Sequence, residues 1–171
     1  MGKPKIEKLI KKGDVNGLLA ALAYEGEGVS PAFERFETRT KAAEALGNLG
    51  SPDAIEPLRR ALGDVSEQIS KYTAMAPDMI KAADEVMERA TRFRPSPSTE
   101  AQSPEYLQEN LQMMEVMMAA VEMNRQSGVV YGRALRKLGD QDASLTEQFL
   151  ATVKAFDEKK AEQSSREIQQ Q

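Results

Sequence analysis

The sequence contains no cysteine, no histidine and no tryptophan among its 171 residues, and aromatic residues make up only 5% of it. Without cysteine the chain forms no disulfide and has no thiol nucleophile, which suits a reducing compartment. Without histidine it has no Ser–His–Asp relay, and carboxylates alone disfavour a zinc site. We therefore expect no catalytic residues, no metal site and no cofactor.

Long apolar runs are also missing. No window approaches the roughly 20 apolar residues of a membrane helix, and the charged N-terminal stretch lacks the apolar centre of a signal peptide. The 23 basic and 27 acidic residues nearly balance, with a pI of about 5.1. Nucleic-acid-binding proteins are typically basic, whereas dense basic runs occur here only at 3–12 and 89–94. We expect a cytoplasmic protein with no membrane contact, and nucleic acid is disfavoured as a partner.

The residues that are abundant indicate an all-α fold. The apolar content is dominated by Ala, Leu and Met, which favour helices, and apolar positions recur every three or four residues. Gly13 ends a first helix and Asp14 caps a second, while Ser30–Pro31 starts a helix that Gly50 ends. The expected core positions are Ile6, Leu9, Ile10, Leu18, Leu19, Leu22, Phe33, Phe36, Ala42, Ala43, Leu46, Ile55, Leu58, Ala61 and Leu62.

Residues 38–62, TRTKAAEALGNLGSPDAIEPLRRAL, resemble a HEAT repeat of the phycobilin-lyase (PBS lyase) type, and residues 8–22 resemble a shortened leading repeat. The shared features include paired alanines, which let helices approach closely, and glycines that permit crowding and a left-handed cap. The resemblance implies a short HEAT-like αα-superhelix, an armadillo-like helical solenoid. It also implies that Arg39 and Asp53 stabilise neighbouring repeats through charge-assisted hydrogen bonds. The structural repeat positions are Arg39, Gly47, Gly50, Pro52 and Asp53.

After Leu62 the repeat pattern stops. Residues 64–93 and 104–121 instead carry apolar positions that alternate three and four residues apart, separated by a Pro- and Ser-rich loop at 94–104. This pattern predicts two helices that pack antiparallel as an inserted Met-rich hairpin, with a kink or break near Pro77. Whether residues 64–127 continue the solenoid or pack beside it stays open.

A degenerate terminal repeat is predicted at 128–157. It aligns with the second repeat when Leu138–Gly139 is set on Leu49–Gly50, and residues 144–147 read as a capping box. The expected organisation is therefore HEAT-like hairpins at 1–63, the arm at 64–127, the terminal hairpin at 128–157 and a frayed or disordered tail at 158–171. Asp140 and Asp142 are interpreted as capping residues, and Arg59 as a solvated surface residue.

The methionines of the arm are its most unusual feature. Methionine is adaptable and common on surfaces that accept several partners, but it also fills gaps between packed helices. Met113 and Met117 lie off the centre of the seam, so they are expected to face either a partner or the repeat stack. The proposed partner-binding residues are Met113, Met114, Met117 and Met118.

The favoured function is a non-catalytic protein–protein interaction module or scaffold, because stacked hairpins leave an extended concave face. It would bind another protein through that face, the Met-rich arm, or both. One alternative is an accessory subunit of a chromophore lyase, which relatives of this repeat type imply, although the chain lacks Trp and His for stacking on a tetrapyrrole. The HEAT-repeat hydroxylase of deoxyhypusine needs His–Glu pairs and is excluded. The other alternative is a homo-oligomer formed through the seam helices.

Overall fold

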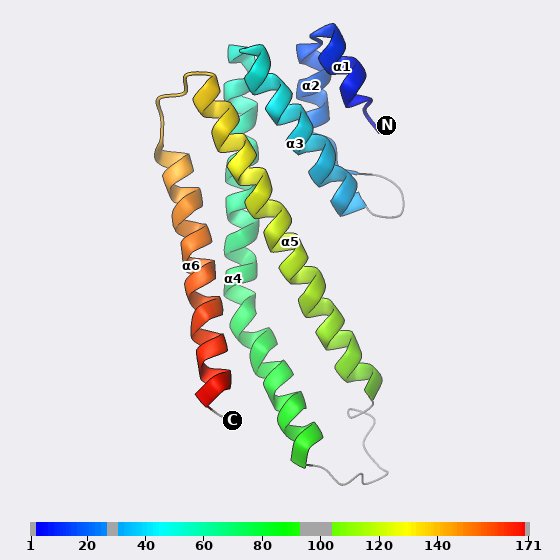
Figure 1. The fold of residues 1–171 in the computed structure, drawn as a ribbon, viewed down its shortest axis with the longest axis vertical. Helices are drawn as coiled ribbons and strands as arrows, with labels where there is room; N and C mark the ends of the chain where they lie inside the picture. The colour runs from blue at the N-terminus through cyan, green and yellow to red at the C-terminus, as the bar shows by residue number, and fades with distance from the viewer. Residues whose placement is uncertain (1–2, 27–30, 93–103, 170–171) are drawn as a thin grey trace.

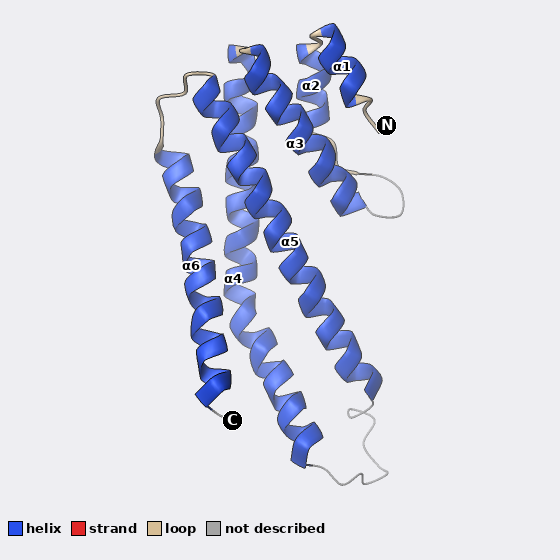
Figure 2. Cartoon of the chain, viewed as in Figure 1, coloured by secondary structure: helices blue, strands red, loops and turns tan. Residues whose placement is uncertain are grey.

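The computed structural model describes residues 3–26, 31–92 and 104–169, with side chains except at 76–92, 104–111, 113, 114, 163, 164 and 166–169. Within these residues every regular element is a helix (Figure 2). The elements are α1 (Ile6–Lys12), α2 (Val15–Leu22), α3 (Pro31–Leu49), the 3-10 turn η1 (Pro52–Ala54), α4 (Ile55–Arg92), α5 (Pro104–Lys137) and α6 (Ser144–Gln169).

Helix boundaries follow local signals in the sequence. The Asp14 side chain accepts the Gly17 N–H at 2.8 Å, which caps α2. Gly13, Gly50 and Gly139 adopt positive φ angles of 62°, 70° and 76°, so each ends its helix in the left-handed conformation that favours glycine. Gly50 and Gly139 occupy equivalent places after α3 and α5, as the predicted repeat alignment requires.

The helices form two rows. α1, α3 and α5 follow one another in the first row, and α2, α4 and α6 follow one another in the second. In Figure 1, α3 and α5 run side by side, and α4 lies between α5 and α6 and passes behind the upper part of α5. Alternating helices that stack row on row bury a continuous core, so the chain has an all-α helical-repeat fold.

The core lies between the two rows. Leu18, Leu46, Leu58 and Leu62 are fully buried, as their spacing predicts. The expectation for Phe33 is wrong: its side chain is 57% exposed in the first turn of α3, where its ring lies 6.4 Å from that of Phe36. Ile10 is also exposed, because α1 spans only two turns and packs one side on α2 and α3.

The arm is not a separate pair of helices. The boundaries expected at 63/64 and 127/128 fall inside α4 and α5, which are continuous and antiparallel (Figure 1). A lone Gly63 does not stop α4, since helices tolerate one glycine at modest cost. α4 does not end at Pro77 either, and its second half leans away from the first (Figure 1). The arm is therefore the extension of two repeat helices.

The tail is helical as far as the structure describes it. α6 continues to Gln169, whereas a frayed or disordered segment was expected from residue 158. The stretch has few apolar residues, but it contains no proline or glycine and is rich in Glu, Gln and Lys. These residues favour helix, so nothing local ends α6.

Candidate functional site

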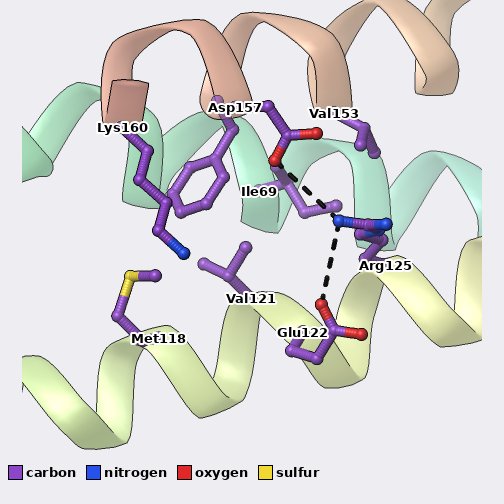
Figure 3. A pocket seen from close by; sticks show the side chains of 9 residues that line it. Ile69, Met118, Val121, Glu122, Arg125, Val153, Asp157 and Lys160 are labelled. Atoms are coloured by element: carbon purple, nitrogen blue, oxygen red, sulfur yellow. Dashed lines mark ion pairs between the residues drawn. The ribbon is translucent and has the colours of Figure 1, made fainter. Parts of the chain in front are cut away.

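A pocket opens where α5 and α6 diverge over α4. α5 packs mainly on α3 and α4, and α6 packs mainly on α4, so the two helices leave a space of about 230 Å³ between them. Figure 3 shows α6 and α5 as opposite walls and α4 as the floor. The lining residues are Ile69 of α4, Met118, Val121, Glu122 and Arg125 of α5, and Val153, Phe156, Asp157 and Lys160 of α6.

The interior of the pocket is apolar. Ile69, Val121 and Phe156 are buried and belong to the hydrophobic core, while Met118 and Val153 are partly buried and pack against it. Ile69, Met118 and Val121 occupy the seam positions that the three-and-four spacing predicts. The pocket is therefore a place where the core itself reaches the surface, so its apolar lining can accept an apolar group.

Charged side chains surround the opening. Arg125 lies 4.0 Å from Glu122 on its own helix and 3.9 Å from Asp157 on α6, so it spans the two walls (Figure 3). All three side chains are about half exposed. Ion pairs of this length and exposure contribute little to stability, so Arg125 is free to exchange partners.

A proline in α4 leaves free a backbone carbonyl that α6 contacts near the pocket. Pro77 has no N–H, so the Thr73 carbonyl four residues earlier in α4 lacks its usual helical donor. Lys159 of α6 donates to that carbonyl at 3.4 Å. The Thr73 hydroxyl meanwhile donates to the Ile69 carbonyl at 2.7 Å. The Thr73 carbonyl oxygen, which Pro77 leaves without a helical donor, thus connects α4 with α6.

An ion pair holds the other end of the same three helices. Arg59 of α4 donates to both carboxylate oxygens of Asp140, through Nε at 3.0 Å and a terminal nitrogen at 2.5 Å. The Asp140 side chain is only 5% exposed, and the Arg59 hydrogen bond lowers the pKa of Asp140, although burial opposes the shift. The same bond raises the pKa of Arg59. The interpretation of Arg59 as solvated is therefore wrong.

The neighbouring Asp142 is a capping residue, as predicted. Its carboxylate accepts the Ser144 N–H at 3.1 Å and the Ser144 hydroxyl, and these hydrogen bonds lower the pKa of Asp142. The predicted capping box differs in register, because Ser144 is the first residue of α6 rather than its cap. The short connection from α5 to α6 is thereby anchored to α4.

The structure places the predicted methionines differently from one another. Met118 lines the pocket, whereas Met117 is buried at 7% exposure and offers no surface to a partner. Of the two expectations for Met117, burial within the chain is the one observed. The side chains of Met113 and Met114 lie outside the described residues.

The predicted structural positions lie along the second repeat. Arg39 donates to the Tyr24 carbonyl at 2.8 Å and to the Glu25 carboxylate, which links α3 to the end of the first hairpin. A Cβ on Gly47 would lie 2.9 Å from Ala134 Cα, so this glycine lets α3 and α5 touch. Pro52 begins η1, and Asp53 is exposed in its first turn.

The α6 wall of the pocket is not among the positions that the sequence predicts. Phe149, Val153, Phe156 and Lys160 follow a four-, three- and four-residue spacing, which marks one helix face. That spacing shows that a face is packed but not against which helix, so Val153 and Phe156 were not assigned to a site with Met118.

Neither metal binding nor membrane insertion is indicated within the described ranges. No group of three or more carboxylates in 3–26, 31–92 and 104–169 is arranged to hold a metal ion. The search of the same residues for a helix both long and apolar enough to cross a bilayer found none.

Two rows of stacked helices, with hairpins that begin after left-handed glycines, define a helical-repeat fold. The family model described as PBS lyase HEAT-like repeat matches residues 38–64, so the chain contains a HEAT-like repeat of that type. The match covers most of α3, η1 and the start of α4. No curated protein and no solved structure matches the chain. HEAT-like repeats generally mediate protein interactions.

Proposed function

We propose that this protein is a non-catalytic protein-interaction module, and that the pocket between α4, α5 and α6 receives an apolar side chain from an amphipathic helix of another protein. The observation that carries the proposal is the pocket itself, in which core residues of three helices reach the surface. A cavity of about 150 Å³ accommodates benzene, so 230 Å³ is enough for one aromatic or long aliphatic anchor. Such anchors dominate the energy of helix-in-groove complexes.

The charged rim of the pocket fits a partner helix that carries charged residues beside its apolar anchor side chain. Each wall presents one carboxylate and one cation, Glu122 with Arg125 on α5 and Asp157 with Lys160 on α6. The lining residues span eight positions on each helix, from 118 to 125 and from 153 to 160, which corresponds to about 10 Å or two helical turns. A partner helix lying between α5 and α6 would place its flanking polar residues against these charges and complete a four-helix arrangement with α4.

The experiment uses a phage-displayed library of helical peptides selected against the full chain. Enriched peptides are titrated into protein with labelled methyl groups and followed by NMR. We expect the selected sequences to be amphipathic, and the methyl signals of Ile69, Met118 and Val121 to shift. Val153→Trp fills the pocket and should weaken binding at least about tenfold, the loss expected for a blocked anchor site.

Leu150→Trp is the matched control, because it adds the same side chain one turn away on α6, at a position that is 56% exposed. This variant should bind as the unmodified protein does. A library with no enriched sequence would overturn the proposal, and so would enriched peptides that shift methyl groups only elsewhere. Concentration-dependent self-association that Val153→Trp abolishes would assign the pocket to a second copy instead.

A further inference from the structure

The exposed side of α1 carries four lysines. Lys5, Lys8 and Lys12 lie three and four residues apart on one helical stripe, and Lys11 flanks it. All four are exposed, and the stripe is about 10 Å long, since seven residues rise 1.5 Å each. The surface is notable because the protein as a whole carries a net charge of −4.

These lysines have no partners among the described residues, although carboxylates lie close by. Glu7 and Glu37 are the acidic neighbours on α1 and α3, and both are used by other cations. Lys41 pairs with Glu37 at 2.9 Å and lies 3.9 Å from Glu7, while Lys3 pairs with Glu37 at 3.4 Å. Other lysines near α1 therefore form ion pairs, whereas the stripe does not.

Helix stability does not explain the stripe. Lys11 and Lys12 lie in the last turn of α1, where the helix dipole favours cations. Lys5, however, occupies the N-cap of α1 and makes no side-chain cap hydrogen bond. That position favours Ser, Thr, Asp or Asn, and the dipole disfavours a cation there. A residue that opposes the local rule for folding is expected where function requires it.

We propose that the α1 lysine stripe, Lys5, Lys8, Lys11 and Lys12, binds an acidic segment of a partner polypeptide. The complementarity is between spaced carboxylates and four ammonium groups that have no ion-pair partner in the part of the chain that the structure describes. Phosphate recognition generally uses the bidentate fork of Arg, and single-stranded nucleic acid also needs aromatic stacking; α1 contains neither Arg nor an aromatic residue. Insertion into a lipid surface needs a continuous apolar face, whereas Ile6 of α1 is buried in the core, Leu9 packs against it, and Ile10 is the one apolar side chain of α1 that is exposed.

The test measures fluorescence anisotropy of a labelled 20-residue poly-glutamate peptide with the full chain. We expect binding that weakens as salt rises, because exposed charges are screened. The variant K5S/K8Q/K11Q/K12Q removes the stripe and should bind at least about tenfold more weakly. The matched control is K71Q/K137Q/K154Q/R60Q, which removes the same charge elsewhere and should bind within about threefold of the unmodified protein.

Several results would overturn the proposal. They are no poly-glutamate binding at low salt, an equal loss in the control variant, or preferential binding of duplex DNA or phosphatidylglycerol vesicles over the peptide. The inference is independent of the pocket. Val153→Trp should leave poly-glutamate binding unchanged, so failure of either proposal can be recognised without the other.

Discussion

At the scale of single residues, close helix contacts depend on the absence of a side chain. A Cβ on Gly128 of α5 would lie 2.2 Å from the Phe149 ring of α6, and one on Gly47 would lie 2.9 Å from Ala134 Cα. Real Cβ atoms do not approach so closely, so larger residues at these positions force the helices apart. The two glycines thus set the spacing of α5 from α6 and of α3 from α5.

Gly128→Ala is therefore expected to destabilise the fold by about 1–3 kcal/mol, the usual range for overpacking. Gly132→Ala is the control on the same helix, because its Cβ would lie 3.6 Å from Thr146, an ordinary contact. That change should stabilise by about 0.5–1 kcal/mol, since glycine is a poor helix former. Urea unfolding measures both, and equal effects would contradict the packing explanation.

Removing one buried hydroxyl group is expected to stabilise the protein. Thr38 of α3 is 1% exposed, and its Oγ1 has no hydrogen-bond partner within the described residues. Thr38→Val should raise the free energy of unfolding by about 1 kcal/mol, because it removes an unsatisfied polar group at nearly constant shape. Thr40→Val should give no such gain, since the Thr40 hydroxyl donates to the Phe36 carbonyl at 2.7 Å. Thermal unfolding of the two variants distinguishes the cases.

The Arg59–Asp140 pair predicts how stability depends on pH. The folded state lowers the pKa of Asp140, so the pair contributes fully above the unfolded value of about 3.9 and is lost as pH falls through the lower folded value. Asp140→Asn should be less stable than the unmodified protein at pH 7, and the difference should shrink below about pH 4. Asp53→Asn, at an exposed position, is the control in urea unfolding. A pH-independent difference would show that charge is not involved.

At the scale of elements, α4 is both a repeat helix and the base of the arm. It extends from Ile55 to Arg92 and supplies the floor of the pocket. Pro77 frees a carbonyl in this helix, and Lys159 of α6 occupies it at 3.4 Å. Proline normally ends or kinks a helix, because it leaves a carbonyl of the preceding turn without a donor. Here a lysine of the neighbouring helix donates to that carbonyl.

The two residues should consequently be coupled. Pro77→Ala restores the N–H that pairs with the Thr73 carbonyl, so it should stabilise α4 and make Lys159 dispensable. Lys159→Ala is expected to destabilise the unmodified chain measurably but to have little effect in Pro77→Ala, in a double-mutant cycle read by urea unfolding. Lys154→Ala, which removes a surface pair with Glu158 on α6, provides the control. Additive effects would exclude the coupling.

At the scale of the whole molecule, the arm and the repeat stack share helices and a core. Ile69 of α4 and Val121 of α5 belong to the same hydrophobic cluster as Leu46 and Leu58. Deleting the whole arm, residues 64–127, would therefore remove core residues.

A shorter deletion should leave the fold intact. Replacing residues 80–110 with a six-residue Gly/Ser linker keeps Ile69, Met118 and Val121 in place, so we expect cooperative unfolding and an unchanged helical signal per residue. Circular dichroism and urea unfolding provide the measurement. Loss of cooperativity would show that the distal arm is part of the folding core.

Local interactions explain why much of the fold was predictable. Caps, left-handed glycines and three-and-four spacing act within a few residues, so the helix from Pro31 to Leu49 and the repeat at 38–62 followed from the sequence. The predictions that failed concern where a helix ends and which side chains a neighbouring helix covers. Nothing local shows that α4 passes Gly63 and Pro77 without ending, or that Phe33 lies where no second helix covers it.

An all-helical chain with a HEAT-like repeat and without His or Cys chemistry follows from composition and short-range periodicity, which are properties of the amino-acid sequence. Which helix faces meet depends instead on the three-dimensional fold. Arg59 and Asp140 are 81 residues apart, and the pocket joins Ile69, Met118 and Val153 from three helices. Such pairings depend on how helices stack in space, and identical apolar spacing on each helix does not specify its partner.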